Sequence, residues 1–250
     1  MTGERQAARE RHPRIYRLAY RIDRAIKYSG RRYQCNVCQY RFRAWLQREQ
    51  REWLKLCPMC KSHPRMRLMI FWLQRESDLL EAPRDIAHFA AEPVFSDIMR
   101  KAARGRRYVR IDIQSSLSDV HADICALPFR AAEFDTIICN HVLEHVPDDR
   151  AAMLELRRIL RPGGTAILMV PFHPDRETFE DPSVVDPEQR TELFGQFDHV
   201  RLYGGDYLDR LREAGFDVDC DLYWKSLGEE VAVRYGLQRD EYLIVGRTRD

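Results

Sequence analysis

Short apolar runs alternate with amphipathic segments from residue 84 to the end of the chain. The runs are short enough to be strands: 86–90, 108–112, 120–124, 134–140 and 166–170. Apolar residues at helical spacing lie between several of them: 94–103, 148–160 and 207–214. This alternation predicts an α/β domain with a doubly wound, mostly parallel sheet, and 216–223 and 241–245 as an antiparallel edge pair. Such sheets bind ligands beyond the carboxyl ends of their strands.

Residues 1–82 follow a different pattern. The apolar stripe Ile15, Leu18, Ala19, Ile22 and Ile26 has helical spacing, and a second apolar segment covers 68–80. A basic amphipathic helix can lie on a membrane surface, but we expect the stripe to pack against its own protein. The sequence Glu81-Ala82-Pro83 predicts a boundary. We therefore expect two domains: 1–82, a basic helix and a small module, and 83–250, the α/β domain.

Four of the seven cysteines form two pairs, Cys35-x2-Cys38 and Cys57-x2-Cys60, separated by 18 residues. This spacing is typical of a structural zinc site, because each turn presents two thiolates and two turns complete a tetrahedral shell. Disulfides are disfavoured in a reducing compartment, and a redox site needs only one pair. The spacing predicts a zinc-ribbon-like module whose closed shell makes the zinc structural.

Composition is that of a globular protein, with 44% apolar and 32% charged residues. No run approaches the roughly 18 apolar residues that a membrane span needs, so we expect no transmembrane helix. The Arg-rich start lacks the apolar segment of a signal peptide, which favours a cytoplasmic location.

The net charge of +2 hides an asymmetry. Residues 1–81 contain 19 Lys/Arg and 8 Asp/Glu, whereas the remainder contains 22 and 31. A basic block is compatible with a nucleic-acid partner. The two halves can also simply attract each other, and arginine dominates the positive charge along the whole chain. A nucleic-acid partner is therefore possible but not favoured.

The segment from Phe134 to Asp148 reads FDTIICNHVLEHVPD and is followed by LRRILRPGG at Leu156–Gly164. These stretches resemble the fourth-strand motif, next helix and turn of class I S-adenosylmethionine-dependent methyltransferases of the type 11 kind. The resemblance covers about residues 84–250 and is most specific in its middle third. It implies a Rossmann-like methyltransferase sheet and methyl transfer from S-adenosylmethionine to an oxygen or nitrogen. We favour a small molecule or glycan-type precursor as the acceptor.

The resemblance also implies where the cofactor binds. Asp112 would accept hydrogen bonds from the ribose hydroxyls and Asp123 one from the adenine amino group, while Asn140 and His141 would line the methyl-donor side. The first loop is usually glycine-rich in this family, but here it reads HFAAEP. This loop would bring four residues to the cofactor: His88, Phe89, Ala90 and Glu92. Without any G-x-G motif, a nicotinamide-binding domain is disfavoured.

Candidate general bases are histidines, since their pKa lies near neutrality. We expect His141 and His199 first, with His145 and His173 as further candidates. The sequence His141-x-x-Glu144-His145 also matches a zinc-peptidase motif, but Pro147 follows too soon for the helix that this chemistry needs.

Two other functions stay open. The enzyme can be an RNA methyltransferase that holds its substrate with the basic zinc module. Alternatively, the missing glycines can mark a non-catalytic binding protein with a degenerate cofactor loop. The acidic segment 175–196 is either a lid over the acceptor pocket or a surface excursion.

Overall fold

The computed structural model describes residues 13–48 and 51–248, which divide between two compact units. The first unit comprises the chain up to Phe71 together with Trp224–Gln238. The second comprises Trp72–Tyr223 and the chain from Arg239 onward. The expected boundary at Glu81–Pro83 therefore lies within the second unit, and a segment close to the C-terminus joins the first.

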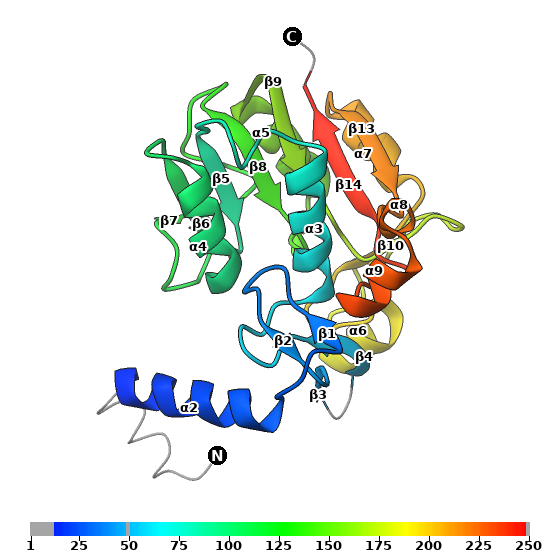
Figure 1. Cartoon of the computed structure of the whole chain (residues 1–250). Helices are drawn as coiled ribbons and strands as arrows, with labels where there is room; N and C mark the ends of the chain where they lie inside the picture. The colour runs from blue at the N-terminus through cyan, green and yellow to red at the C-terminus, as the bar shows by residue number, and fades with distance from the viewer. Residues whose placement is uncertain (1–12, 49–50, 249–250) are drawn as a thin grey trace. The chain divides into compact units, whose positions relative to one another are not determined.

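The second unit is built on a seven-stranded sheet of order β13-β14-β9-β8-β5-β6-β7 (Figure 1). Strand β14 runs antiparallel to both neighbours, and the remaining strands pair in parallel. The doubly wound, Rossmann-like fold and the antiparallel edge pair are thus confirmed. The strands are β5 (Ile86–Phe89), β6 (Tyr108–Asp112), β7 (Val120–His121), β8 (Phe134–Cys139), β9 (Leu160–Ile167), β13 (Asp217–Asp221) and β14 (Leu243–Arg247).

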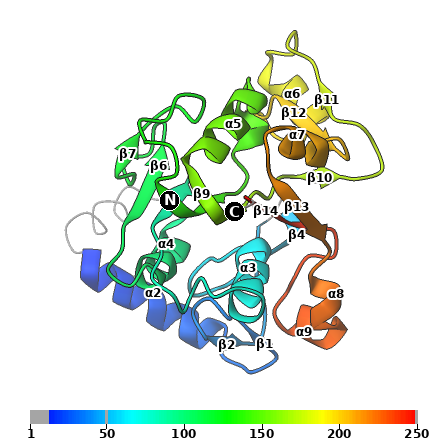
Figure 2. The ribbon, with the colours of Figure 1, turned by 90° about the horizontal axis from the view of Figure 1, so that it is seen from above.

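Helices cover both faces of this sheet (Figure 2). Helices α5 (Asp149–Ile159) and α7 (Tyr207–Glu213) lie on one face, and α4 (Pro93–Ala102) lies on the other. Helix α5 begins where the Asp148 side chain accepts a hydrogen bond from the Ala151 N–H, which satisfies one of the donors at the helix start.

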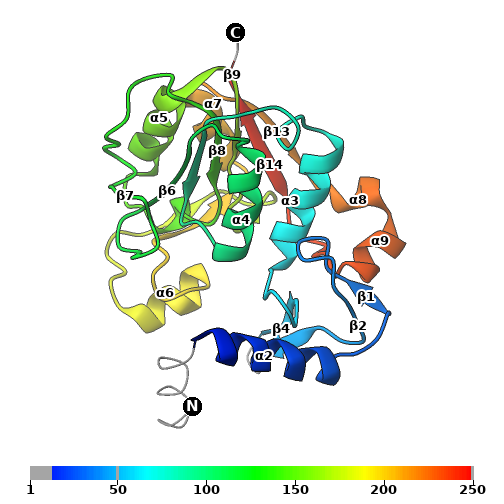
Figure 3. The same cartoon turned by 60° about the vertical axis from the view of Figure 1, so that its left-hand side comes forward.

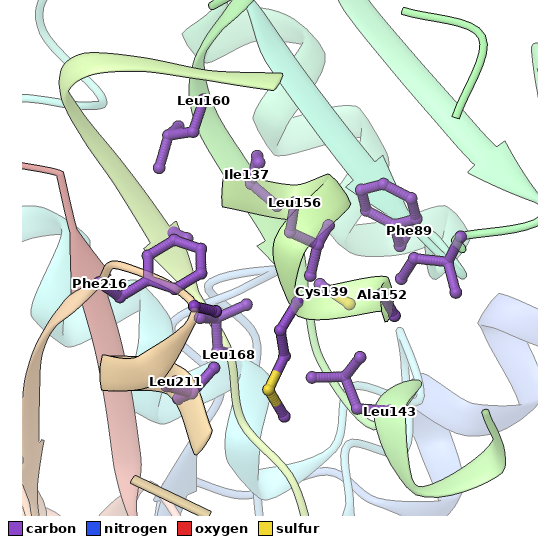
Figure 4. Packing of buried hydrophobic residues seen from close by; sticks show 14 of the residues in the cluster. Phe89, Ile137, Cys139, Leu143, Ala152, Leu156, Leu160, Leu168, Leu211 and Phe216 are labelled. Carbon is purple, nitrogen blue, oxygen red and sulfur yellow. The ribbon is translucent and has the colours of Figure 1, made fainter. Parts of the chain in front are cut away.

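The core between α5, α7 and the sheet is fully buried (Figure 4). Leu156 and Ala152 of α5 and Leu211 of α7 pack with Ile137 of β8 and Leu168 beyond β9, all with no exposed area. The helical spacing predicted burial of Leu156, whereas Leu154, which the same spacing placed inward, is 57% exposed. The apolar pattern therefore accounts for the main core of the domain.

Strand β9 begins earlier than expected. The run at 166–170 predicted its start, but the strand extends from Leu160 to Ile167 and contains Pro162-Gly163-Gly164. Its register with β8 shifts between Leu160 and Thr165, so the glycines lie in a bulge. A Cβ atom on Gly164 would lie 2.8 Å from the Arg161 carbonyl oxygen. Glycine at this position lets the bulge close without a steric clash.

Residues 175–196, expected as a lid or a surface excursion, contain β11 and helix α6 (yellow in Figure 3). Strand β12 lies between β10 and β11 in a small sheet. His173, one of the candidate bases, is exposed at the end of β10. The elements are β10 (Phe172–His173), β11 (Phe179–Glu180), α6 (Pro187–Phe194) and β12 (Arg201–Gly204).

The first unit consists of small antiparallel strand pairs and helices. Strands β1 and β2 pair with each other, as do β3 and β4, and the two cysteine pairs follow β1 and β4. The elements are α2 (Pro13–Lys27), β1 (Tyr33–Gln34), β2 (Arg41–Phe42), β3 (Leu46–Arg48), β4 (Arg51–Leu56), α3 (Pro64–Arg75, which continues into the second unit), α8 (Trp224–Leu227) and α9 (Glu229–Arg234).

The apolar stripe of α2 does not pack as we expected. Leu18, Ile22 and Ile26 are 61%, 52% and 74% exposed, and the side chain of Ile15 lies outside the described side chains. The helix itself is confirmed, but the expectation that its stripe is covered by the protein is wrong for these three residues. Across 13–48 and 51–248, no helix is both long enough and apolar enough to span a bilayer.

Candidate functional site

The carboxyl ends of three parallel strands meet at one edge of the sheet. Phe89, the last residue of β5, lies opposite β6 on one side and the last residue of β8 on the other. Ala90, Asp112 and Asn140 therefore come together at this edge. The chain continues from β5 to β6 in one direction and from β8 to β9 in the other, which makes the edge a topological switch point. Open α/β sheets bind their ligands at such points.

Two strand ends at this edge have left-handed backbone conformations without glycine. Ala90 has φ of +46° and donates its N–H to the Ile111 carbonyl oxygen at 3.0 Å. His141, just beyond β8, has φ of +55°. Such conformations cost a non-glycine residue about 1 kcal/mol or more and concentrate at functional sites. Ala90 thus adopts the kind of turn for which a glycine-rich loop is normally needed.

The other first-loop residues divide between the edge and the interior. Phe89 is a core residue, and the His88 imidazole is 1% exposed with Nδ1 2.8 Å from the Tyr108 hydroxyl. Ala90 is exposed, and Glu92 is partly exposed just before α4. Ala90 and Glu92 therefore remain accessible to a ligand, whereas the side chains of His88 and Phe89 do not.

We predict that His88 lowers the free energy of unfolding as the pH decreases. Burial lowers the pKa of His88 to about 4, against a weaker opposing effect of Glu92. The unfolded chain therefore binds a proton at this residue below about pH 6.5, while the folded chain resists it down to about pH 4. The free energy of unfolding should decline by about 3 kcal/mol across that window. Urea unfolding as a function of pH measures this, and H88Q should flatten that part of the profile.

The two predicted cofactor acids lie on neighbouring strand ends. Asp112 accepts hydrogen bonds at Oδ1 from two backbone N–H groups of the following turn, both at 2.8 Å. The pairing of β6 with β7 places Asp112 opposite His121, two residues before Asp123. Asp123 accepts the Cys125 N–H at 2.9 Å. Both carboxylates are held by local turns and remain at least partly exposed.

Asn140 and His141 connect the end of β8 to the chain beyond β9. Asn140 is buried and accepts the Met169 N–H at 3.0 Å, and the His141 N–H donates to the Met169 carbonyl oxygen at 2.7 Å. The His141 ring lies between two carboxylates, with Nδ1 3.4 Å from Glu144 and Nε2 3.5 Å from Glu241. Sequence reasoning missed Glu241, because its proximity follows from the place of β14 in the sheet.

The second predicted base, His199, lies beside the same turn of chain. Residues Leu143–His145 form a single 3-10 turn. The zinc-peptidase motif needs a sustained helix here, and its absence agrees with the expectation from Pro147. His199 is 7% exposed, its ring packs edge-on against His145 at 4.7 Å between centroids, and burial lowers its pKa. Glu144, 1% exposed, lies close to both predicted bases. The structure thus brings His141 and His199 to one buried carboxylate.

The four predicted metal ligands cluster in the first unit. Their sulfur atoms all lie within 4.8 Å of one another, with Cys35–Cys60 at 3.7 Å and Cys38–Cys57 at 3.6 Å, and none forms a disulfide. A tetrahedral zinc–thiolate shell with bonds of about 2.3 Å requires sulfur separations of about 3.8 Å. The cluster therefore fits a four-coordinate metal ion.

A fully buried arginine supports this cluster. The Arg67 guanidinium donates to the carbonyl oxygens of Lys55, Ser62, Tyr235 and Gly236 at 2.6, 2.6, 2.6 and 3.0 Å. It thereby joins the second cysteine turn to the segment Trp224–Gln238. Burial lowers its pKa to about 10, so the charge persists at neutral pH. No sequence motif marked Arg67.

Comparison with known families places residues 84–168 in the family described as a methyltransferase domain. The switch-point edge described above falls within this range. The matched range lies within the α/β unit, and we call this unit the methyltransferase domain after the match. The resemblance first seen in the residues following Phe134 is confirmed for this domain.

Several known proteins are similar to parts of this chain. The uncharacterized protein YafE of Escherichia coli K12 is 32% identical over 127 residues, which is 49% of this chain and 55% of that protein. A probable S-adenosylmethionine-dependent methyltransferase of Mycolicibacterium smegmatis is 29% identical over 120 residues, 46% of this chain and 39% of that protein. The matches thus span only about half or less of these relatives. A solved methyltransferase of Archaeoglobus fulgidus has 13% identity and a TM-score of 0.48, covering 73% of this chain and 94% of that one.

Proposed function

We propose that the methyltransferase domain binds S-adenosylmethionine across the carboxyl ends of β5, β6 and β8 and catalyses transfer of its methyl group. The observation that supports this best is the alignment of Ala90, Asp112 and Asn140 at the switch point of the sheet. Asp112 accepts hydrogen bonds from the ribose hydroxyls, and Asp123 accepts one from the adenine amino group. Ala90 supplies a tight turn through which the backbone approaches the cofactor.

The protein contributes alignment and proton transfer in this proposal. S-adenosylmethionine, when bound, supplies a methyl carbon activated by its sulfonium group. His141, whose side chain is 21% exposed at the end of β8, accepts a proton from the acceptor. Glu144 and Glu241 fix its ring and stabilise the resulting imidazolium. We assign this role to His141 rather than to His199, because His199 is nearly buried.

We propose that the acceptor is the hydroxyl or amine of a small molecule or glycan-type precursor. His141, the proposed proton acceptor, lies between Glu144 and Glu241 just after β8. This polar arrangement favours an acceptor molecule with a compact polar group.

The four cysteines, we propose, hold a structural zinc ion. Cys35, Cys38, Cys57 and Cys60 would supply all four ligands, which leaves no coordination position for substrate. The zinc stabilises the first unit and takes no part in methyl transfer.

Calorimetric titration with S-adenosylmethionine and S-adenosylhomocysteine tests the cofactor site. We expect binding near micromolar Kd, about −8 kcal/mol, which D112A weakens about 10- to 100-fold by removing hydrogen bonds to a charged acceptor. The matched control is D217A, an exposed acid on the outermost strand β13 at the other end of the sheet, which should leave binding unchanged. Absence of binding to the wild-type protein would contradict the enzyme and favour a non-catalytic descendant.

A further inference from the structure

We propose that Glu144, His145 and His199 form a second metal site, which binds a divalent transition-metal ion with borderline ligand preference such as Zn²⁺ or Co²⁺. One ligand atom from each side chain lies within 4.8 Å of the other two. The site is separate from the four-cysteine cluster and belongs to the methyltransferase domain. Two imidazoles and a carboxylate are a ligand set that zinc commonly takes in sites that keep an open coordination position.

The strongest indication is the state of the Glu144 carboxylate. Its side chain is 2% exposed, and within the described residues the hydrogen-bond partners of its oxygens are limited to the His141 ring and its own backbone N–H. His141 Nδ1 lies 3.4 Å from Oε1. A buried carboxylate requires a counter-ion or metal to compensate its lost hydration.

In both histidines, Nδ1 lies beside a backbone carbonyl oxygen. His199 Nδ1 lies 3.0 Å from the Phe194 carbonyl oxygen, and His145 Nδ1 lies 3.3 Å from the Asp198 carbonyl oxygen. A carbonyl oxygen only accepts, so Nδ1 carries the proton in each ring and Nε2 carries the lone pair. Hydrogen bonding of one nitrogen to a backbone carbonyl is the usual way in which a metal-binding histidine is oriented.

Long-range contacts hold the three ligands together. The Val200 N–H donates to the Glu144 carbonyl oxygen at 2.9 Å, one residue after His199. The Arg201 guanidinium, 4% exposed, donates to the carbonyl oxygens of Leu143, Val146 and Pro147 around the same turn. The ligand-bearing turn and the start of β12 are therefore clamped to each other, as a preformed site requires.

The positive charge of Arg201 is balanced by carboxylates, so it does not repel a metal ion at the proposed site. Its guanidinium pairs with Glu180 at 2.7 Å and lies 3.8 Å from Asp149. Asp149 and Glu180 also pair with Arg210, so two carboxylates balance two guanidinium groups and Glu144 is not their counter-ion. Tetrahedral bonds of about 2.0–2.2 Å place ligand atoms about 3.4 Å apart, and the three ligand atoms here all lie within 4.8 Å of one another.

Three protein ligands leave at least one position open on the ion. If the proposed methyl transfer holds, the ion would take an oxygen of the acceptor at an open position and act there as a Lewis acid. This last step rests on the proposed function, whereas binding of the ion does not.

Metal content of the intact chain tests the site directly. After saturation with Zn²⁺ and removal of excess metal, we expect two zinc ions per chain in the wild type and one in E144Q and in H199A. E177Q and H173A, which change exposed residues outside the site, should keep two. One zinc per wild-type chain, as expected if a water molecule alone satisfies Glu144, would overturn the proposal, and so would two zinc ions in both variants.

Loading with Co²⁺ separates loss of the site from loss of folding. The four-cysteine site should give thiolate-to-cobalt charge-transfer bands in every variant, which reports that the first unit is intact. The second ion should add visible bands without charge transfer, and E144Q and H199A should lose only these. Titration with S-adenosylhomocysteine in the same samples reports the methyltransferase domain. In the wild-type protein, cofactor binding with only one metal ion contradicts the metal site alone, whereas two metal ions without cofactor binding contradict the proposed function alone.

Discussion

Removal of zinc is expected to unfold the first unit while the methyltransferase domain keeps its fold. Structural zinc in four-ligand peptides contributes about 10–16 kcal/mol of apparent binding free energy, which is comparable to the whole stability of a small domain. The buried residues around Cys35, Phe42 and Cys57 form only a small cluster, so burial alone does not replace this contribution. C57S should act in the same way as a chelator.

Hydrogen exchange measured by mass spectrometry resolves the two units in the full chain. Chelation or C57S should remove amide protection from residues 28–62 and 224–238, whereas the sheet strands from β5 to β9 should keep theirs. The matched control is C220S, a partly buried cysteine of β13 outside the cluster, which should change neither region. Unchanged protection in the first unit after complete removal of metal would contradict a stabilising zinc site.

Replacement of Arg67 should be the most damaging single change that leaves every proposed ligand in place. R67A removes a buried cation and leaves buried carbonyl oxygens of Lys55, Ser62, Tyr235 and Gly236 without their donor. It also removes a positive charge close to a zinc–thiolate group of net negative charge. Loss of one partner of a buried ionic network costs about 3–5 kcal/mol, and we expect that decrease in the free energy of unfolding of the zinc-loaded protein.

Urea unfolding of the zinc-loaded variants measures this decrease. R67K should recover only part of the stability, because an ammonium group lacks the planar geometry that reaches several carbonyl oxygens at once. The exposed Arg43 provides the control, and R43A should change the unfolding free energy by less than about 0.5 kcal/mol. Equal stability of R67A and R43A would show that the guanidinium network contributes nothing.

The sequence by itself determined the features that depend on local chemistry. Strand β6 was predicted with its observed bounds, Tyr108–Asp112, since alternating apolar residues report burial directly. The two C-x2-C turns predicted the cysteine cluster, because short spacings constrain geometry before any tertiary contact forms. The motif after Phe134 predicted the methyltransferase domain that comparison then confirmed.

Only the tertiary structure decided which distant residues meet. Arg67 contacts carbonyl groups 168 and 169 positions later, and Glu241 reaches His141 across 100 positions because β14 inserts beside β9. The apolar stripe of α2 showed that a helix would form but not that Ile26 would be exposed. Periodicity records which face of an element is apolar. The partners of that face, and the convergence of Glu144 with His199, depend on strand order and register, which no local pattern encodes.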